Sequence, residues 1–242
     1  MLKLPKPGTF WPMFFALPVC LWLFWPSIVE AGAWVLAGTR WTERDEQAYQ
    51  GFVRSLGESG CGSLNRFIKD PKVNPLFSEE DKKFDLSPDC ADFPYLVRSY
   101  VAYKLRLPFS YVSSVTGPGG GDERYRDGNR PSGFKSVADY SSPQQLFNHV
   151  VLCNSGYFRM APDVENSDTY TPRITPGTIV PGTLYYDPNG HVALVYQVSP
   201  DGRIRLIDAH PDRSVSRPWF GSKFALGSKI QGGGFRRWRP LW

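Results

Sequence analysis

One stretch of the chain, residues 86–113, restricts the fold more than any other. Apolar side chains recur within it at helical spacing, which predicts a helix with one apolar face: Phe93, Leu96, Val97, Tyr100, Val101 and Leu105. Because proline cannot continue a helix, Leu107-Pro108 ends it, and residues 109–112 are expected to follow as a strand. The chain therefore contains a helix that must pack on a core and that leads directly into a strand.

Cys90 follows the turn-forming Ser87-Pro88-Asp89 and lies at or near the N-terminus of this helix. The unpaired N–H groups and the positive end of the helix dipole favour a thiolate there, which is the reactive form of cysteine. Pro94 cannot donate a hydrogen bond to the Cys90 carbonyl, so either the first turn is irregular or the regular helix begins one or two residues later. Cys90 is a candidate nucleophile, and a buried apolar role is the alternative.

A nucleophilic cysteine needs a base, and His191 is the candidate. Residues 187–190 are a turn sequence, so His191 opens the strand that follows. Residues 199–202 turn the chain again, and residues 203–208 return as the partner strand. Asp208 ends this strand near the level at which His191 begins its own. Its carboxylate is suited to hold the imidazole in one tautomer.

The same region leaves two alternatives open. His210 lies two residues after Asp208, so both side chains face the same side of an extended strand, and His210 is the alternative third residue. Two histidines and two carboxylates could also bind zinc, through His191, Asp208, His210 and Asp212. That site would lack helical H-x-x-x-H spacing and would leave Cys90 without a role. No metal and no other cofactor are therefore expected.

The order of Cys90, His191 and Asp208 resembles that of the papain-like cysteine hydrolases, in which a Cys at a helix start precedes a His that opens a strand and an Asp or Asn that ends the next strand. Asp89-Cys90-Ala91 resembles the Cys motif of NlpC/P60 peptidases, and Gly-His-Val-Ala-Leu-Val at residues 190–195 is similar to the His strand of NlpC/P60 and CHAP domains.

Two further segments carry the resemblance. The Pro-Gly-Thr segment that begins at Pro181 is similar to the Pro-Gly-Asp segment of NlpC/P60 and CHAP domains, with Thr183 in place of the Asp. The passage of the Cys helix into residues 107–112 resembles the transglutaminase-like core. NlpC/P60 domains often use His as the third residue, whereas transglutaminases use Asp.

The resemblance covers roughly residues 86–113 and 177–212. It implies an α+β fold of the papain-like or NlpC/P60-like type, in which the Cys-bearing helix packs on an antiparallel sheet. It also implies a cysteine peptidase or amidase with a Cys90, His191 and Asp208 triad, and with the Cys90 N–H in the oxyanion hole. Peptidoglycan or envelope peptides are the expected substrates. A transglutaminase-like acyl transferase and a non-catalytic exported binding module on the same scaffold are the alternatives.

Residues 1–33 look like a secretory signal peptide. Lys3 and Lys6 precede an uncharged run over residues 10–29, and Ala31-Gly32-Ala33 fits an A-x-A cleavage site. The run is long enough for an uncleaved membrane anchor, which is the alternative. Cleavage after Ala33 and export to the periplasm or the exterior are expected, with residues 34–242 as a single domain.

Export makes the cysteine count informative. Removal of the leader leaves Cys61, Cys90 and Cys153, and the simplest assignment pairs Cys61 with Cys153 in a disulfide and leaves Cys90 free. The alternative is that Cys61 and Cys153 are unpaired buried thiols. The net charge of +5 is mild and the positive residues are scattered, so nucleic-acid binding is not expected. The expected partner is a peptide or peptidoglycan-like substrate, and the expected state is a monomer.

Other parts of the chain give coarser expectations. Residues 117–130 begin with a glycine-rich run but lack the Gly-Lys-Ser/Thr ending of a phosphate loop, which argues against nucleotide binding. They are interpreted as a surface loop, with an active-site flap as an alternative role. A helix is expected over residues 34–57, another from Ser142-Pro143, and a short strand over residues 158–160. The basic, aromatic tail is expected to pack its Trp rings on the domain and point its Arg groups to water.

Overall fold

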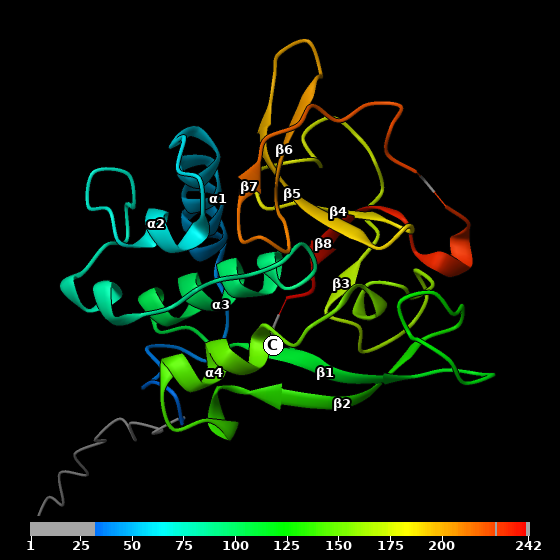
Figure 1. The fold of residues 1–242 in the computed structure, drawn as a ribbon, viewed down its shortest axis with the longest axis horizontal. Helices are drawn as coiled ribbons and strands as arrows, with labels where there is room; N and C mark the ends of the chain where they lie inside the picture. Colours follow the sequence, from blue (N-terminus) through cyan, green and yellow to red (C-terminus); the bar gives the residue numbers. More distant parts are fainter. Residues whose placement is uncertain (1–31, 226, 241–242) are drawn as a thin grey trace, which may run out of the picture.

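The computed structural model describes residues 32–225 and 227–240, and these residues form an α+β fold. Within these ranges the elements are four α-helices, two antiparallel sheets and short 3-10 turns (Figure 1). The larger sheet has six strands in the order β3-β8-β4-β5-β6-β7, and the smaller one pairs β1 with β2.

The bounds of the elements follow the chain. The α-helices are α1 (Glu43–Glu58), α2 (Leu64–Ile68), α3 (Phe93–Leu105) and α4 (Pro143–Val150). The strands are β1 (Ser110–Thr116), β2 (Arg130–Ser136), β3 (Thr169–Tyr170), β4 (Leu184–Asp187), β5 (His191–Val198), β6 (Ile204–Ala209), β7 (Val215–Ser216) and β8 (Gly234–Trp238). The 3-10 turns are η1 (Glu79–Lys83), η2 (Val137–Asp139), η3 (Ser155–Tyr157) and η4 (Lys229–Gln231).

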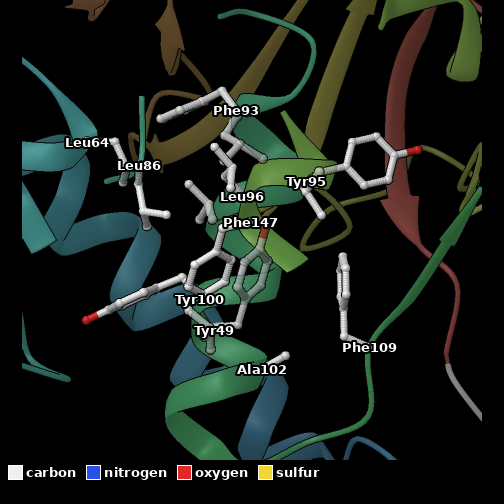
Figure 2. Packing of buried hydrophobic residues seen from close by; sticks show 14 of the residues in the cluster. Tyr49, Leu64, Leu86, Phe93, Tyr95, Leu96, Tyr100, Ala102, Phe109 and Phe147 are labelled. Atoms are coloured by element: carbon white, nitrogen blue, oxygen red, sulfur yellow. The ribbon is translucent and has the colours of Figure 1, made fainter. Parts of the chain in front are cut away.

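The predicted Cys helix is α3, and it is buried on more than one face. It packs against α1, α4 and β5, and every residue from Phe93 to Ala102 is buried. Figure 2 shows side chains of α3 surrounded by residues of other elements, among them Leu64 and Phe147. A helix that is covered all round needs more than a single apolar stripe, and α3 accordingly carries apolar residues on most of its surface.

A proline marks the start of α3, and a residue in the left-handed backbone conformation marks its end. Pro94 occupies the first turn, where its missing N–H costs nothing, so the helix begins at Phe93 and Cys90 lies in the turn before it. At the other end Arg106 adopts φ 55°, and the Leu107 N–H bonds to the Ala102 carbonyl at 2.8 Å. The regular helix thus begins three residues after Cys90, close to the later start that was one of the two alternatives.

One buried charge interrupts the apolar surface of α3. The Arg98 guanidinium makes two hydrogen bonds to the Glu46 carboxylate of α1, at 2.8 and 2.5 Å. It also stacks on the ring of Trp41, with 3.3 Å between the guanidinium carbon and the ring centroid. A buried cation needs a partner, and Arg98 therefore fixes the contact between α1 and α3.

The helix α1 begins later than the sequence pattern predicted. Thr42 and Asp45 form a capping box, in which the Thr42 hydroxyl accepts the Asp45 N–H and the Asp45 carboxylate accepts the Thr42 N–H. This reciprocal cap sets the first turn at Glu43 rather than at residue 34. The C-terminal carbonyls of α1 accept hydrogen bonds from Arg217, which ties the helix to the far edge of the large sheet.

The large sheet is buried on both faces. Leu194 and Ile207 contribute to the cluster shared with the helices. The opposite face carries a second cluster around Tyr185 and Leu206, which partly buried aromatic residues cover: Phe220, Phe224 and Phe235. Both faces of β4 are covered, so all four of its residues are buried.

Two expectations about the later chain are wrong. The tail packs the Trp238 ring on the domain, as expected, with the indole N–H donating to the Tyr49 hydroxyl at 3.1 Å, and β8 pairs with β4 and β3 inside the sheet. Arg236 does not face water; it is 1% exposed, and its guanidinium bonds to Thr169 and to three backbone carbonyls around it. The expected strand at residues 158–160 is absent, since η3 and the turn after it occupy this region.

The predicted Cys61–Cys153 disulfide is not present. Within the part of the chain that the structure describes, Cys61, Cys90 and Cys153 are all free thiols. Cys61, three residues after the end of α1, accepts a hydrogen bond from Arg217 through its carbonyl. Cys153 follows α4 and is buried, and burial raises the pKa of its thiol. The two cysteines are held by different neighbours, and the core keeps its packing without a covalent link.

Residues 1–31, which include most of the predicted leader, lie outside the described residues. Gly32 and Ala33, just before the predicted cleavage point, are part of the fold. The Ala33 N–H bonds to the Val137 carbonyl at 2.9 Å, and Ala33 and Trp34 are each 7% exposed. In the described ranges, no helix has the length and apolar character needed to cross a membrane.

Gly32 makes a close approach that only glycine permits. Its φ is +45°, and an added Cβ would lie 2.1 Å from the Val137 carbonyl oxygen. In a chain that keeps residues 1–33, we therefore expect Gly32→Ala to lower the free energy of unfolding by roughly 1–3 kcal/mol, because the backbone must shift and strain. Chemical denaturation of the variant and the parent chain measures this difference.

Gly51→Ala is the matched control. Gly51 is exposed in the middle of α1, and an added Cβ would meet no atom within 4 Å. This change should raise the unfolding free energy by about 0.5–1 kcal/mol through helix propensity. Equal effects of the two substitutions would show that Gly32 is not packed as described.

Candidate active site

The candidate site forms where the turn between β4 and β5 meets the N-terminus of α3. Asp187 and His191 are paired across the two strands, with residues 188–190 between them as the turn. The Asp187 carboxylate accepts the Asn189 N–H at 2.9 Å, and Gly190 takes φ +101°. This local bonding fixes the turn and sets His191 as the first residue of β5, as the sequence predicted.

Cys90 lies against the same turn. Its side chain is half-buried, and its Sγ is 3.7 Å from the Gly190 carbonyl oxygen. The thiol is also close enough to the His191 imidazole to contribute to that ring's pKa. Residues 100 positions apart in the sequence therefore meet at one point.

The imidazole of His191 is held from its other side by Asp208. The distance from His191 Nε2 to Asp208 Oδ2 is 2.6 Å, and Asp208 is 4% exposed. Because Nε2 is engaged by the carboxylate, Nδ1 is the ring nitrogen available to the thiol. The structure thus brings the three predicted residues together in the order thiol, imidazole, carboxylate.

Ser216 is a site residue that sequence reasoning missed. It pairs with Asp208 across β6 and β7, and its hydroxyl donates to Asp208 Oδ1 at 2.5 Å. Both oxygens of the Asp208 carboxylate are therefore occupied, which fixes its orientation. A serine in a two-residue strand offers no pattern by which it could have been found from the sequence.

The alternative third residue, His210, does not take the place of Asp208. Its Nε2 is 4.0 Å from Asp208 Oδ1, beyond hydrogen-bond distance, and it lies just after the end of β6. Its ring is instead stacked beside that of His191, with centroids 6.1 Å apart. His210 is a neighbour of the His191–Asp208 pair rather than a member of it.

The electrostatics of the pair follow from this bonding. Burial disfavours the charged imidazole, but the hydrogen bond to Asp208 and the neighbouring Cys90 outweigh it and raise the pKa of His191 to about 10. Burial also disfavours the Asp208 carboxylate, yet the hydrogen bonds from His191 and Ser216 lower the pKa of Asp208 below its ordinary value. The two directions agree, and both favour an imidazolium next to a carboxylate.

A second carboxyl group lies next to the thiol and was also missed. Asp92 is 3% exposed, and its Oδ1 is buried without a hydrogen-bond partner. Burial, and secondarily the charge of Asp89, raises the pKa of Asp92 to about 9. Asp92 is therefore a neutral carboxylic acid at pH 7, and no negative charge from it opposes a thiolate at Cys90.

The alternative zinc site is not assembled. Among the residues that the structure describes, no group of three or more His, Cys, Asp or Glu side chains is placed to hold a metal ion. The Asp212 carboxylate caps its own turn, where it accepts hydrogen bonds from the backbone N–H and the hydroxyl of Ser214. The donor atoms of the four residues do not converge on a point.

A separate cleft of about 960 Å³ lies away from these residues, between α3, β1 and the end of β8. Its lining includes Phe109, Phe134, Tyr170 and Trp238. None of Cys90, His191 and Asp208 borders this cleft. Hydrogen-bond geometry, rather than cavity size, is what identifies the candidate site.

Comparison with known proteins adds no identification. No protein-family model matches the chain, and no curated protein or solved structure matches it either.

The pKa of His191 can be tested through its partner. We expect the imidazole to stay protonated up to about pH 10, and Asp208→Asn to lower that pKa because the charged acceptor is lost. The stability that the His191 charge supplies is complete below pH 6.5, its ordinary pKa, and is lost as the pH rises through about 10. An NMR titration of the imidazole, with unfolding measured across the same range, checks both statements.

His210→Ala is the control, because His210 makes no hydrogen bond to Asp208. It should leave the titration of His191 nearly unchanged. A fall in the His191 pKa as large as that in Asp208→Asn would mean that His210, and not Asp208, is the residue that holds the imidazole.

Proposed function

We propose that this chain is a cysteine peptidase or amidase of the papain-like, NlpC/P60-like type. The observation that carries the proposal is the convergence of three side chains from distant elements. Cys90 precedes α3, its Sγ lies by the turn that carries His191, and His191 Nε2 bonds to the buried carboxylate of Asp208. Hydrolysis by a thiol requires a nucleophile next to a base, and a third group that orients the base. Cys90, His191 and Asp208 are arranged in this way.

In the proposed resting state the thiol proton already lies on His191, so the reaction begins from a Cys90 thiolate beside an imidazolium. The Cys90 thiolate then attacks the carbonyl carbon of an amide, and a C–S bond forms as the carbonyl becomes an oxyanion. The Cys90 backbone N–H, at the start of α3, supports that charge. Collapse breaks the C–N bond, and the His191 imidazolium protonates the leaving amine.

A thioester on Cys90 remains after the amine departs. His191, now neutral, accepts a proton from water as the water attacks the thioester carbonyl. The C–S bond breaks, the carboxylic acid leaves, and the Cys90 thiolate is restored beside the protonated His191. Asp208 keeps the imidazole oriented in both halves and stabilises its charged form, and the Ser216 hydroxyl holds Asp208 in place.

The proposed substrate is a peptide or peptidoglycan-like polymer outside the cytosol. The support comes from the sequence: the apolar N-terminal run that suits export, and the likeness of residues 86–113 and 177–212 to NlpC/P60 and CHAP domains. We propose export to the periplasm or the exterior, with retention through the N-terminal run as the alternative. The mild net charge of +5 is compatible with an anionic envelope.

The arrangement around Cys90 favours an enzyme over a non-catalytic binding module. A binding module on this scaffold would be expected to bury Cys90 or to direct it away from His191. Cys90 is only half-buried and lies 3.7 Å from the carbonyl of the residue before His191. Acyl transfer to an amine uses the same three residues and is an outcome of the substrate test below.

The contact with His191 should make Cys90 the most reactive of the three thiols that the structure describes. We expect iodoacetamide to alkylate Cys90 at pH 7 faster than Cys61 or Cys153, and His191→Ala to remove that difference. Mass spectrometry of peptides from samples labelled across pH identifies the modified residue and its rate.

Cys90→Ser is the control, because it reports background labelling at Cys61 and Cys153. Cys153 should stay unlabelled in the folded chain, since it is buried and its thiol pKa is raised. A Cys90 that reacts like a free thiol in both the parent chain and His191→Ala would sink the catalytic proposal.

The substrate class is tested with muropeptides. We expect amide cleavage by the parent chain and a loss of at least about 1,000-fold in rate for Cys90→Ala, because the covalent step is removed. An added primary amine distinguishes hydrolysis from transfer: a hydrolase releases the free acid, whereas an acyl transferase yields the new amide. Separation of the products by chromatography and mass spectrometry reads both outcomes.

A further inference from the structure

The turn at residues 187–190 positions two parts of the site at once. Gly190 presents its carbonyl to Cys90 Sγ, and His191 follows it directly. A small displacement of this turn would therefore change the thiol–imidazole geometry from both sides. The proposed chemistry tolerates little displacement, because a misplacement of about 1 Å costs on the order of 100-fold in rate.

Two anchors hold the turn. At its start, the Asp187 carboxylate accepts the N–H groups of Asn189 and Ala225. At its middle, Arg159 Nη1 donates to the Pro188 carbonyl at 2.9 Å. Arg159 belongs to the segment after η3 and is only 5% exposed, although it has no part in the thiol, imidazole and carboxylate set.

Arg159 also bonds to the loop at residues 117–130. Its Nε donates to the Arg126 carbonyl, and its Nη2 donates to Asp127 Oδ1, each at 2.9 Å. Three acceptors on two separate segments are thus joined by one planar guanidinium. The Asp127 side chain is 46% exposed, so its ion pair with Arg159 contributes little to stability. The position of the guanidinium is set mainly by its hydrogen bonds to the Arg126 and Pro188 carbonyls.

The loop at residues 117–130, to which Arg159 bonds, is held in place by hydrogen bonds of its own. Asn129 is fully buried, and its amide donates to the carbonyls of Glu123 and Gly156. The Asn129 oxygen accepts Arg126 Nε at 2.7 Å. These hydrogen bonds fix the loop against η3. Through its own hydrogen bonds, Arg159 connects the fixed loop to the turn before His191.

We infer that Arg159 is a positioning residue for the catalytic pair: with the 117–130 loop as its support, its guanidinium holds Pro188 and so sets Gly190 and His191 against Cys90. The inference rests on the proposed function and deepens it. It gives the glycine-rich loop a role that is neither a phosphate site nor a free flap. Lys cannot replace Arg here, because one ammonium cannot reach three acceptors in the fixed plane of a guanidinium.

The test uses the full chain with Arg159→Lys and Arg159→Met. We expect the rate of Cys90 alkylation at pH 7 to fall by about 10–100-fold in Arg159→Met, and by less in Arg159→Lys, which keeps one donor. The alkylation profile should move toward that of an ordinary thiol, and the pKa of His191 should fall from about 10 in both variants. Circular dichroism and thermal unfolding establish that each variant is folded.

Arg124→Ala is the matched control, because Arg124 lies in the same loop and pairs with exposed Asp122 without touching the turn. It should leave the alkylation rate and the His191 titration unchanged. Should Arg159→Met fail to fold, the conservative Arg159→Lys carries the decision. A folded Arg159→Lys with the alkylation profile and the His191 pKa of the parent chain overturns the inference.

The outcomes for the two proposals are separable. If Cys90 in the parent chain lacks reactivity that depends on His191, the proposed function fails, and the His191 titration still decides whether Arg159 positions the ring. If Cys90 is reactive in the parent chain and equally so in Arg159→Lys, the function stands and the positioning role is rejected.

Discussion

The burial of α3 is the constraint on which the rest of the structure depends. A helix that exposes almost no side chain from Phe93 to Ala102 needs α1, α4 and the sheet around it at the same time. Those three contacts cover the helix from Phe93 to Ala102, so its accessible positions lie at the two ends: Cys90 in the turn before it and residues 103–105 in its last turn. The sheet that covers α3 brings the β4–β5 turn to Cys90. The packing of α3 therefore also determines where Cys90 and His191 meet.

The polar groups in and around this core are bonded in ways that fix positions. Arg98 bonds Glu46, Arg236 bonds a ring of carbonyls, and Arg217 bonds the end of α1. Each of these cations is bonded to acceptors of other elements, and each therefore joins segments far apart in the sequence. The His191, Asp208 and Ser216 chain follows the same rule, except that its first member remains partly accessible and so is free to react.

The sequence predicted the elements of the site better than their surroundings. Cys90 before a helix, His191 at the start of a strand and Asp208 near the end of the next all follow from proline, turn residues and alternation, which are local signals. The β2 and β8 strands and the absence of the Cys61–Cys153 disulfide depend on contacts across the chain, whereas the late start of α1 comes from the local Thr42–Asp45 capping box. Composition alone pointed the Arg groups of the tail to water, whereas the pairing of β8 with β4 makes Arg236 a buried residue.

The choice between Asp208 and His210 shows where sequence reasoning ends. Both residues lie two apart near the end of one strand, so their order alone does not separate them. By itself, the sequence determined that a thiol, an imidazole and a carboxylate stand at element ends, because turn and helix signals are written in neighbouring residues. Only the tertiary structure decided that Asp208 faces His191, that Ser216 orients Asp208 and that Arg159 braces the turn, because hydrogen bonds form between atoms that packing brings together.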